Sequence, residues 1–153
     1  LPRCAAVRKQ CMIGMKKSAY RLEEQVGHLL RRANQRHTAI FFDGLGQKLT
    51  PMQFAVLVKI GDEGEVSQNL LGRLAAMDPA TVQGVVRRLR ERGLIDARPD
   101  PEDRRRSLWR LSDTGKALTQ ETLSDAEAIT ERTLEALDSK ERATFLRLLR
   151  KLA

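Results

Sequence analysis

Nine of the twenty arginines fall within residues 87–110, a stretch that contains no lysine. Arginine offers planar, forked N–H donors that match guanine edges, phosphates and a narrow minor groove. A surface that needed only positive charge would also admit lysine, whose ammonium group is a compact point charge. The stretch therefore predicts a surface that holds double-stranded DNA.

The composition of the whole chain agrees with a polyanionic partner. The 153 residues carry a net charge of +8 and a sequence pI near 10.1, a balance that favours nucleic acid or an anionic surface. No apolar run reaches the roughly 18 residues that a membrane span needs, and no signal-peptide pattern is present. We expect a cytoplasmic protein that does not interact with membranes.

The parts of an enzyme are missing from the sequence. The two histidines, His28 and His37, and the two cysteines, Cys4 and Cys11, supply neither a catalytic triad nor a metal cluster. We interpret the cysteines as reduced thiols, and the alternative is an intermolecular or redox role. The sequence thus predicts no enzymatic activity, no metal and no cofactor.

Helical spacing of apolar residues dominates outside the arginine-rich stretch. A first long helix is expected over residues 20–41, after which Gly44 and Gly46 are expected to be turn residues. The sequence Thr-Pro-Met-Gln at residues 50–53 is a capping box that opens a second helix. A short third helix is expected to follow Ser67.

A fourth helix, expected over residues 79–92 with Asp78 as its N-cap and Pro79 in its first turn, has two distinct faces. Apolar residues at helical spacing must face inward: Val82, Val85, Val86 and Leu89. Small and polar residues occupy or flank the opposite face: Ala80, Thr81, Gln83, Gly84, Arg87 and Arg88. Gly84 contributes nothing to a core there, and it would let another surface approach the helix backbone closely.

A β-hairpin is expected to follow that helix. Residues 94–98 and 107–111 are typical of strands, and a segment rich in proline, aspartate and arginine joins them. Trp109 and Leu111 share one face of the second strand and should pack inward. A long helix is expected over residues 113–137, and a capping box at residues 138–141 opens a last amphipathic helix.

This order of elements predicts a mainly α fold with a small β-hairpin wing. Short helices before a turn, a basic helix after it and a following hairpin together describe a winged helix-turn-helix. The flanking N- and C-terminal helices carry more apolar surface than one small core can cover. A second copy of the chain is the expected partner for that surface, which predicts a homodimer.

Three stretches, in order and spacing, match a single family. They are Leu49-Thr50-Pro51-x-Gln53-Phe54, Val85-x-x-x-Leu89-x-x-x-Gly93-Leu94-Ile95, and Arg98 to Arg105 followed by Leu111-Ser112-Asp113-Thr114-Gly115. By these stretches the chain resembles the MarR family of winged helix-turn-helix transcription regulators, over nearly all of its length from Leu22. The resemblance implies a repressor that binds a pseudo-palindromic operator.

The resemblance also implies which residues contact DNA. In the helix expected over residues 79–92, which corresponds to the recognition helix of the family, they are Pro79, Thr81, Gln83, Gly84, Arg87 and Arg88. In the wing they are Asp103, Arg104, Arg105 and Arg106. Arg105 would enter the minor groove, and Asp103 would orient it by an ion pair.

Members of this family often respond to a small ligand, and one polar helix face suggests its chemistry. His28, Arg32 and Gln35 share a face of the first helix, with Arg36 beside them. Cations on a partly buried face suit a small anionic effector such as an aromatic carboxylate or its coenzyme A thioester. The segment is similar to family branches that control aromatic-acid catabolism. The alternative is that these residues bridge helices or subunits by ion pairs.

We expect residues 1–19 to be an N-terminal extension of uncertain origin and residues 20–153 to be a single MarR-like domain. Within it, residues 20–44 and 113–153 would supply dimerisation helices, and residues 50–111 the winged helix-turn-helix. The alternative function is an architectural DNA-binding protein without a ligand response. Such a protein would coat DNA with a steep salt dependence and little sequence preference.

Overall fold

The computed structural model describes residues 20–103 and 106–153. The chain divides into two compact units, Leu1–Ala33 and Asn34–Ala153. The described part of the first unit contains a short 3-10 helix, η1 (Leu22–Glu24), and the beginning of helix α1 (Val26–Leu45). Its large apolar side chains are exposed. Arg31 of this unit contacts His28, with 3.0 Å between Nη2 and Nδ1.

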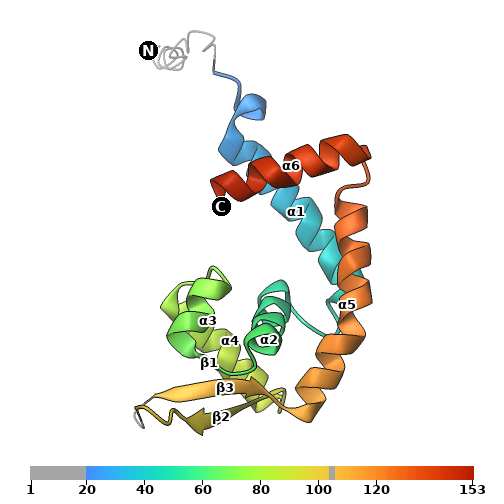
Figure 1. Cartoon of the computed structure of the whole chain (residues 1–153). Coiled ribbons are helices and arrows are strands. Elements are labelled where there is room, and N and C mark those ends of the chain that lie inside the picture. The colour runs from blue at the N-terminus through green and yellow to red at the C-terminus, as the bar shows by residue number, and fades with distance from the viewer. Residues whose placement is uncertain (1–19, 104–105) are drawn as a thin grey trace, which may run out of the picture. The chain divides into compact units, whose positions relative to one another are not determined.

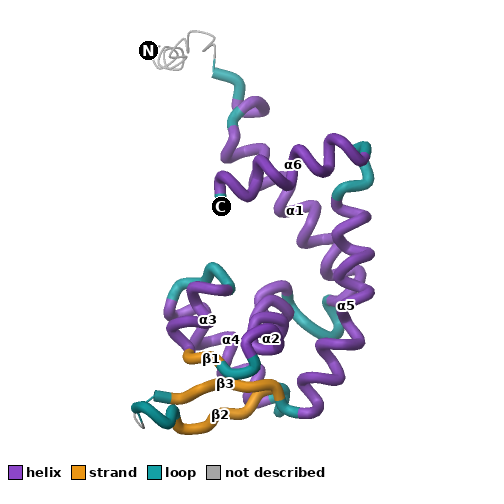
Figure 2. Tube along the Cα trace, viewed as in Figure 1, coloured by secondary structure: helices purple, strands orange, loops and turns teal. Residues whose placement is uncertain are grey.

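The second unit contains a helix-turn-helix and a small sheet (Figures 1 and 2). Its helices are α2 (Pro51–Glu63), α3 (Gln68–Leu74) and α4 (Pro79–Glu91), followed after the sheet by α5 (Asp113–Thr133) and α6 (Ser139–Leu152). Its strands are β1 (Val66–Ser67), β2 (Ile95–Pro99) and β3 (Ser107–Leu111). The fold is therefore mainly helical with a β wing, as the sequence predicted.

The sheet has one strand more than the expected hairpin. Its order is β1-β3-β2, and both pairings are antiparallel. Val66 pairs with Trp109, and Ala97 pairs with Trp109 from the other side. A strand of two residues carries no periodic pattern, so the sequence could not reveal β1. As a result β3 is the central strand, and Trp109 is held on both sides.

The main core lies between helices α2, α3 and α4 and one face of the sheet. Its fully buried side chains include Leu57, Ile60, Leu71, Leu89 and Ile95. Burying one such side chain stabilises the fold by roughly 1.5–3 kcal/mol. Phe54 packs against this core and also against a second cluster formed by Phe41, Leu45 and Ile129.

The predicted helix starts are confirmed by their hydrogen bonds. Thr50 Oγ1 accepts the N–H of Gln53 at 3.2 Å, and Gln53 Oε1 accepts the N–H of Thr50 at 3.1 Å. Ser67 caps α3, and Asp78 caps α4 with Pro79 in its first turn. Asp138 and Glu141 form the second capping box, at the start of α6. Each cap satisfies backbone donors that the first turn leaves free.

The expected end of the first helix was wrong. Helix α1 continues through Gly44 and ends at Leu45, four residues beyond the expected end at residue 41. A Cβ at Gly44 would lie 3.2 Å from Cδ1 and from Cγ1 of Ile129 on α5. Glycine at this position therefore serves close packing of two helices rather than a turn. Gly46, in contrast, does lie in a turn.

Ion pairs join the end of α1 and the segment after it to α5. Asp43 pairs with Arg132 at 2.8 Å, and Lys48 pairs with Glu121 at 2.7 Å.

Helix α5 ends at Thr133, so the expected helix over residues 113–137 was four residues too long. Helix α6 leaves Phe145, Leu148 and Leu152 exposed. None of the described helices is both long enough and apolar enough to cross a bilayer.

Candidate nucleic-acid interface

Helix α4 presents the outward face that the sequence predicted. Val82, Val85, Val86 and Leu89 are buried in the core. Pro79, Ala80, Gln83, Arg87 and Arg88 are exposed, and Thr81 and Gly84 are half-buried. A Cβ at Gly84 would meet nothing nearer than the Arg88 guanidinium, 3.9 Å away. The backbone of α4 is therefore open to close approach at this position.

Asp78 fixes the beginning of α4. Its Oδ1 accepts the N–H groups of Ala80 at 3.0 Å and Thr81 at 2.9 Å, and its Oδ2 accepts the Thr81 hydroxyl at 2.5 Å. These hydrogen bonds, foremost the one from the Thr81 side chain, hold the pKa of Asp78 below its ordinary value. The hydroxyl proton of Thr81 is therefore already donated to Asp78 at the start of the helix. Towards DNA it can offer its lone pairs and its methyl group.

The arginines of α4 differ in what they contact. Arg87 lies 3.9 Å from Glu91, and both side chains are exposed, so this pair is weak. Among the described residues, Arg88 and Arg90 have no ion-pair partner. Arg92 turns back to the protein instead, where it donates to the Lys48 carbonyl oxygen at 2.8 Å and to Gln53 Oε1 at 3.3 Å. Arg92 therefore ties the end of α4 to the start of α2, a structural role that the sequence did not indicate.

The base of the wing is held by an ion pair that the sequence also did not indicate. Arg98 on β2 forms a bidentate pair with Glu65, which immediately precedes β1. The hydrogen bond from Arg98 lowers the pKa of Glu65, and the same bond raises the pKa of Arg98. These two residues are 33 positions apart. No local pattern could have paired them.

Two of the four wing residues taken from the family resemblance are described. Arg106 lies 3.9 Å from Oδ2 of the buried Asp100, and its carbonyl oxygen accepts the N–H of Asp100 at 3.0 Å. Asp103 accepts the N–H of Arg106 through its carbonyl oxygen at 2.8 Å. Arg104 and Arg105 lie outside the described residues. The wing contacts to DNA stay a prediction.

The residues expected to bind an effector are spread along α1. Arg36 donates to Glu135 Oε1 at 2.6 Å and to the Arg132 carbonyl oxygen at 3.4 Å, which agrees with the ion-pair alternative for this residue. Arg32 and Gln35 are exposed and make no side-chain hydrogen bond or ion pair with the described residues. No group of three potential metal ligands occurs in the described part of the chain.

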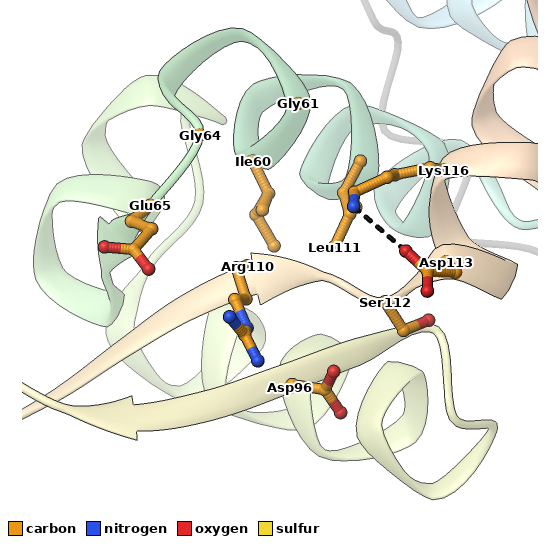
Figure 3. Close-up of a pocket in the computed structure, with 10 residues that line it drawn as sticks. All are labelled: Ile60, Gly61, Gly64, Glu65, Asp96, Arg110, Leu111, Ser112, Asp113 and Lys116. Carbon is orange, nitrogen blue, oxygen red and sulfur yellow. Dashed lines mark hydrogen bonds and ion pairs between the residues drawn. The ribbon is translucent and has the colours of Figure 1, made fainter.

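A cavity of about 630 Å³ is lined by the end of α2, by strands β2 and β3, and by the start of α5 (Figure 3). Its charged residues come from four segments: Glu65, Asp96 on β2, Arg110 on β3, and Asp113 and Lys116 on α5. Lys116 donates to Asp113 at 3.0 Å. Three carboxylates and two cations line this cavity, so its mixed charge does not suit DNA.

A second cavity, of about 460 Å³, lies along α4. Its described lining includes Gln68 at the start of α3, Gln83, Arg87 and Arg90 on α4, and Trp109 on β3. This lining adds Gln68, Arg90 and Trp109 to the surface that the sequence had outlined. Arg90 lies three residues after Arg87, and that helical spacing was a usable signal for it.

Comparisons with known proteins point to one family. Residues 47–106 match the MarR family model. The chain is 43% identical over 134 residues to the HTH-type transcriptional repressor NicR of Pseudomonas putida, covering 87% of this chain and 85% of NicR. A probable transcriptional regulator from Pseudomonas aeruginosa is 47% identical with a TM-score of 0.85, covering 87% of this chain and 100% of that one.

A further solved structure is similar to a comparable degree. It is that of Bordetella bronchiseptica BpsR, whose DNA binding is regulated by 6-hydroxynicotinic acid. BpsR is 46% identical with a TM-score of 0.85, and the match covers 87% of this chain and 96% of BpsR.

Proposed function

This chain belongs to the MarR family of transcriptional regulators, and we propose that it represses transcription as a homodimer which a small anionic aromatic acid releases from its operator. The single observation that carries the DNA-binding part is the geometry of α4. Its four apolar residues are buried, so its small, amide and guanidinium groups all face outward. Such a helix fits the major groove, where these groups distinguish base pairs.

The assignment of residues within α4 follows from their chemistry. Gln83 suits adenine, whose edge offers one acceptor and one donor, and Arg87 or Arg88 suits guanine or a phosphate. Pro79, Thr81 and Gly84 would allow the start and middle of the helix to approach the DNA closely. Asp103, Arg104, Arg105 and Arg106 would place the wing in the adjacent minor groove.

The homodimer is supported by apolar surface that remains exposed. Phe145, Leu148 and Leu152 on α6 are 40%, 47% and 75% exposed. In the first unit, Leu29 and Leu30 on α1 are 49% and 47% exposed. We propose that residues 20–44 and 113–153 dimerise, that residues 50–111 bind DNA, and that the protein acts in the cytoplasm.

The proposed effector rests on the chemistry of the polar face of α1 and on the similarity of this chain to BpsR, whose DNA binding is regulated by 6-hydroxynicotinic acid. An aromatic ring with a carboxylate needs an apolar contact and a cation, and Arg32 is a cation without a partner among the described residues. His28, Gln35 and Arg36 would complete the site. An anion that binds there would compete with Glu135 for Arg36.

The experiment that tests this function uses DNA that the protein itself selects. Repeated rounds of binding to a pool of short random duplexes should enrich one two-fold symmetric sequence. Binding to that duplex should then weaken when 6-hydroxynicotinic acid is added. A selected duplex that is bound equally with and without a series of aromatic acids would favour a regulator of other specificity. Failure to enrich any sequence would favour the architectural alternative.

Arg105→Ala is expected to weaken binding to the selected duplex by about 1 kcal/mol and to leave folding and oligomeric state intact. An arginine in a narrow minor groove gains from its negative potential, and alanine cannot replace that contact. Fluorescence anisotropy with labelled duplex measures the loss, and circular dichroism checks the fold. Unchanged affinity would remove Arg105 from the interface.

Arg32→Ala is expected to leave DNA binding in place and to raise the concentration of 6-hydroxynicotinic acid that releases the duplex by roughly tenfold or more. The reason is the loss of a charge-assisted hydrogen bond to the carboxylate. Arg21→Ala is the matched control, because Arg21 is another exposed arginine of the first unit and its side chain pairs with Glu24 at 3.0 Å rather than with a residue of the proposed site. A release concentration that shifts equally in both variants would contradict the role of Arg32.

A further inference from the structure

The segment between α1 and α2, residues 46–50, contacts two helices that are far apart in the sequence. The carbonyl oxygen of Lys48 accepts a hydrogen bond at 2.8 Å from Nη2 of Arg92, which lies at the end of α4. The ammonium group of Lys48 pairs with Glu121 at 2.7 Å and lies 3.8 Å from Asp125, both on α5. In Figure 2 this segment is the loop that leads from α1 to α2 beside α5. Lys48 therefore joins the end of α4 to the middle of α5.

The two halves of this connection differ in strength. The hydrogen bond from Arg92 joins a guanidinium to a carbonyl oxygen, and charge-assisted bonds of this kind are stronger than neutral ones. A second bond from Arg92, to Oε1 of the buried Gln53 at 3.3 Å, restricts the guanidinium further. The ion pair between Lys48 and Glu121 is weaker, because 40% and 62% of the two side chains are exposed to water. The contact with α4 is thus the firmer half.

The two helices joined in this way belong to different parts of the proposed dimer. Helix α4 faces the DNA, whereas α5 lies within residues 113–153, which are assigned to dimerisation. In a two-fold dimer the angle between α4 and α5 determines the distance between the two copies of α4. One extra base pair between two half-sites moves them apart by about 3.4 Å and rotates them by about 35°. A protein that holds α4 firmly cannot follow that change.

We propose that Arg92 and Lys48 are positioning residues that select the spacing of the two half-sites, because they hold α4 at a fixed angle to α5. This inference rests on the proposed function and adds a determinant of operator choice that contacts no base. To bind a duplex with one base pair inserted between the half-sites, the protein must break the Arg92 hydrogen bond or distort the DNA. The wild type should therefore bind that duplex at least about tenfold more weakly than the selected one. We call this factor the spacing ratio.

Arg92→Met tests the contact with α4, since methionine keeps an unbranched stem but has no donor. It should lower the spacing ratio by about tenfold, the factor that corresponds to one charge-assisted hydrogen bond. The loss of affinity caused by a single base change within a half-site should stay as in the wild type, because Arg92 is assigned to the protein and not to the DNA. Competition titrations with the three duplexes measure both quantities, and thermal unfolding checks that the variant folds.

Lys48→Glu tests the contact with α5, because it places a carboxylate beside Glu121 and Asp125. It should lower the spacing ratio by roughly twofold to fivefold, in keeping with the weaker, exposed ion pair. Adding Glu121→Lys to the same chain restores a pair of opposite charges, so the double variant should recover the wild-type spacing ratio. A general loss of stability would not be reversed by this exchange of charges.

Lys59→Glu is the matched control for Lys48→Glu. Lys59 has the same exposed fraction, 40%, and it pairs with Asp62 at 3.1 Å within the single helix α2. The substitution therefore makes the same change of charge and breaks an ion pair that joins no two elements. A change in net charge affects the affinities for both spacings alike and cancels in their ratio. The spacing ratio of Lys59→Glu should equal that of the wild type.

The proposal is overturned if the wild type binds both spacings equally, or if Arg92→Met keeps the wild-type spacing ratio. It is also overturned if Lys59→Glu lowers the ratio as Lys48→Glu does. If Arg92→Met does not fold, the exchange of charges decides, and a double variant that stays at the ratio of Lys48→Glu overturns the proposal. Failure of the proposed function gives a different result, because no two-fold symmetric sequence is then enriched from the random pool.

Discussion

Gly115→Ala is expected to destabilise the protein by about 3 kcal/mol, the upper part of the range for steric overpacking of a tightly packed site. Gly115 is buried in the first turn of α5, and a Cβ there would overlap the carbonyl oxygen of Leu94. That oxygen also accepts the N–H of Ser112 at 3.1 Å. Ser112 in turn caps α5 by accepting the N–H of Gly115 at 3.0 Å.

Neither Gly115 nor Leu94 can move to relieve this overlap without a loss of stability. Leu94 leads into β2, whose first residue, Ile95, is buried and pairs with Leu111. The urea midpoint of unfolding measures the loss. Gly84→Ala is the control, because it makes the same change inside a helix where the added Cβ meets only ordinary contact. It should leave stability unchanged or raise it by up to about 1 kcal/mol. Equal stabilities of the two variants would contradict the packing explanation.

Arg87→Ala is expected to remove about 1–3 kcal/mol of the preference for the selected duplex over a scrambled one. Arg87 stands on the outward face of α4, and its pair with exposed Glu91 at 3.9 Å is too weak to withhold the guanidinium from DNA. A bidentate contact to guanine is lost when the side chain is truncated. Competition titrations with both duplexes measure the preference.

Glu91→Ala is the control for Arg87→Ala, since it breaks the same ion pair and leaves the guanidinium in place. Its preference for the selected duplex should match that of the wild type. If Arg87→Ala weakens both duplexes equally, then Arg87 contacts a phosphate, and base recognition on α4 must come from Gln83 or Arg88.

The sequence predicted those parts of the fold that depend on neighbouring residues. The caps at Thr50, Asp78 and Asp138 need only a side chain and the next turn of backbone. The two faces of α4 follow from the helical period. The glycine of the Leu111-Ser112-x-x-Gly115 stretch was recognised by resemblance alone. Its physical reason, the approach of Leu94, became visible only in the structure.

The features that the sequence missed depend on residues far apart in the chain. Strand β1 exists because Val66 meets Trp109, and helix α1 continues through Gly44 because Ile129 packs against it. The same holds within the candidate interface. Arginine content and spacing outlined the surface, but they could not separate Arg92, which binds the Lys48 carbonyl, from Arg90, which lines the cavity.

The most direct test of the central claim is hydroxyl-radical footprinting of the selected duplex, combined with the mass of the complex in sedimentation. We predict two protomers on one duplex and two protected half-sites, related by two-fold symmetry and centred about 10 base pairs apart. One protomer per duplex, or protection that spreads along the DNA without half-sites, would contradict the account.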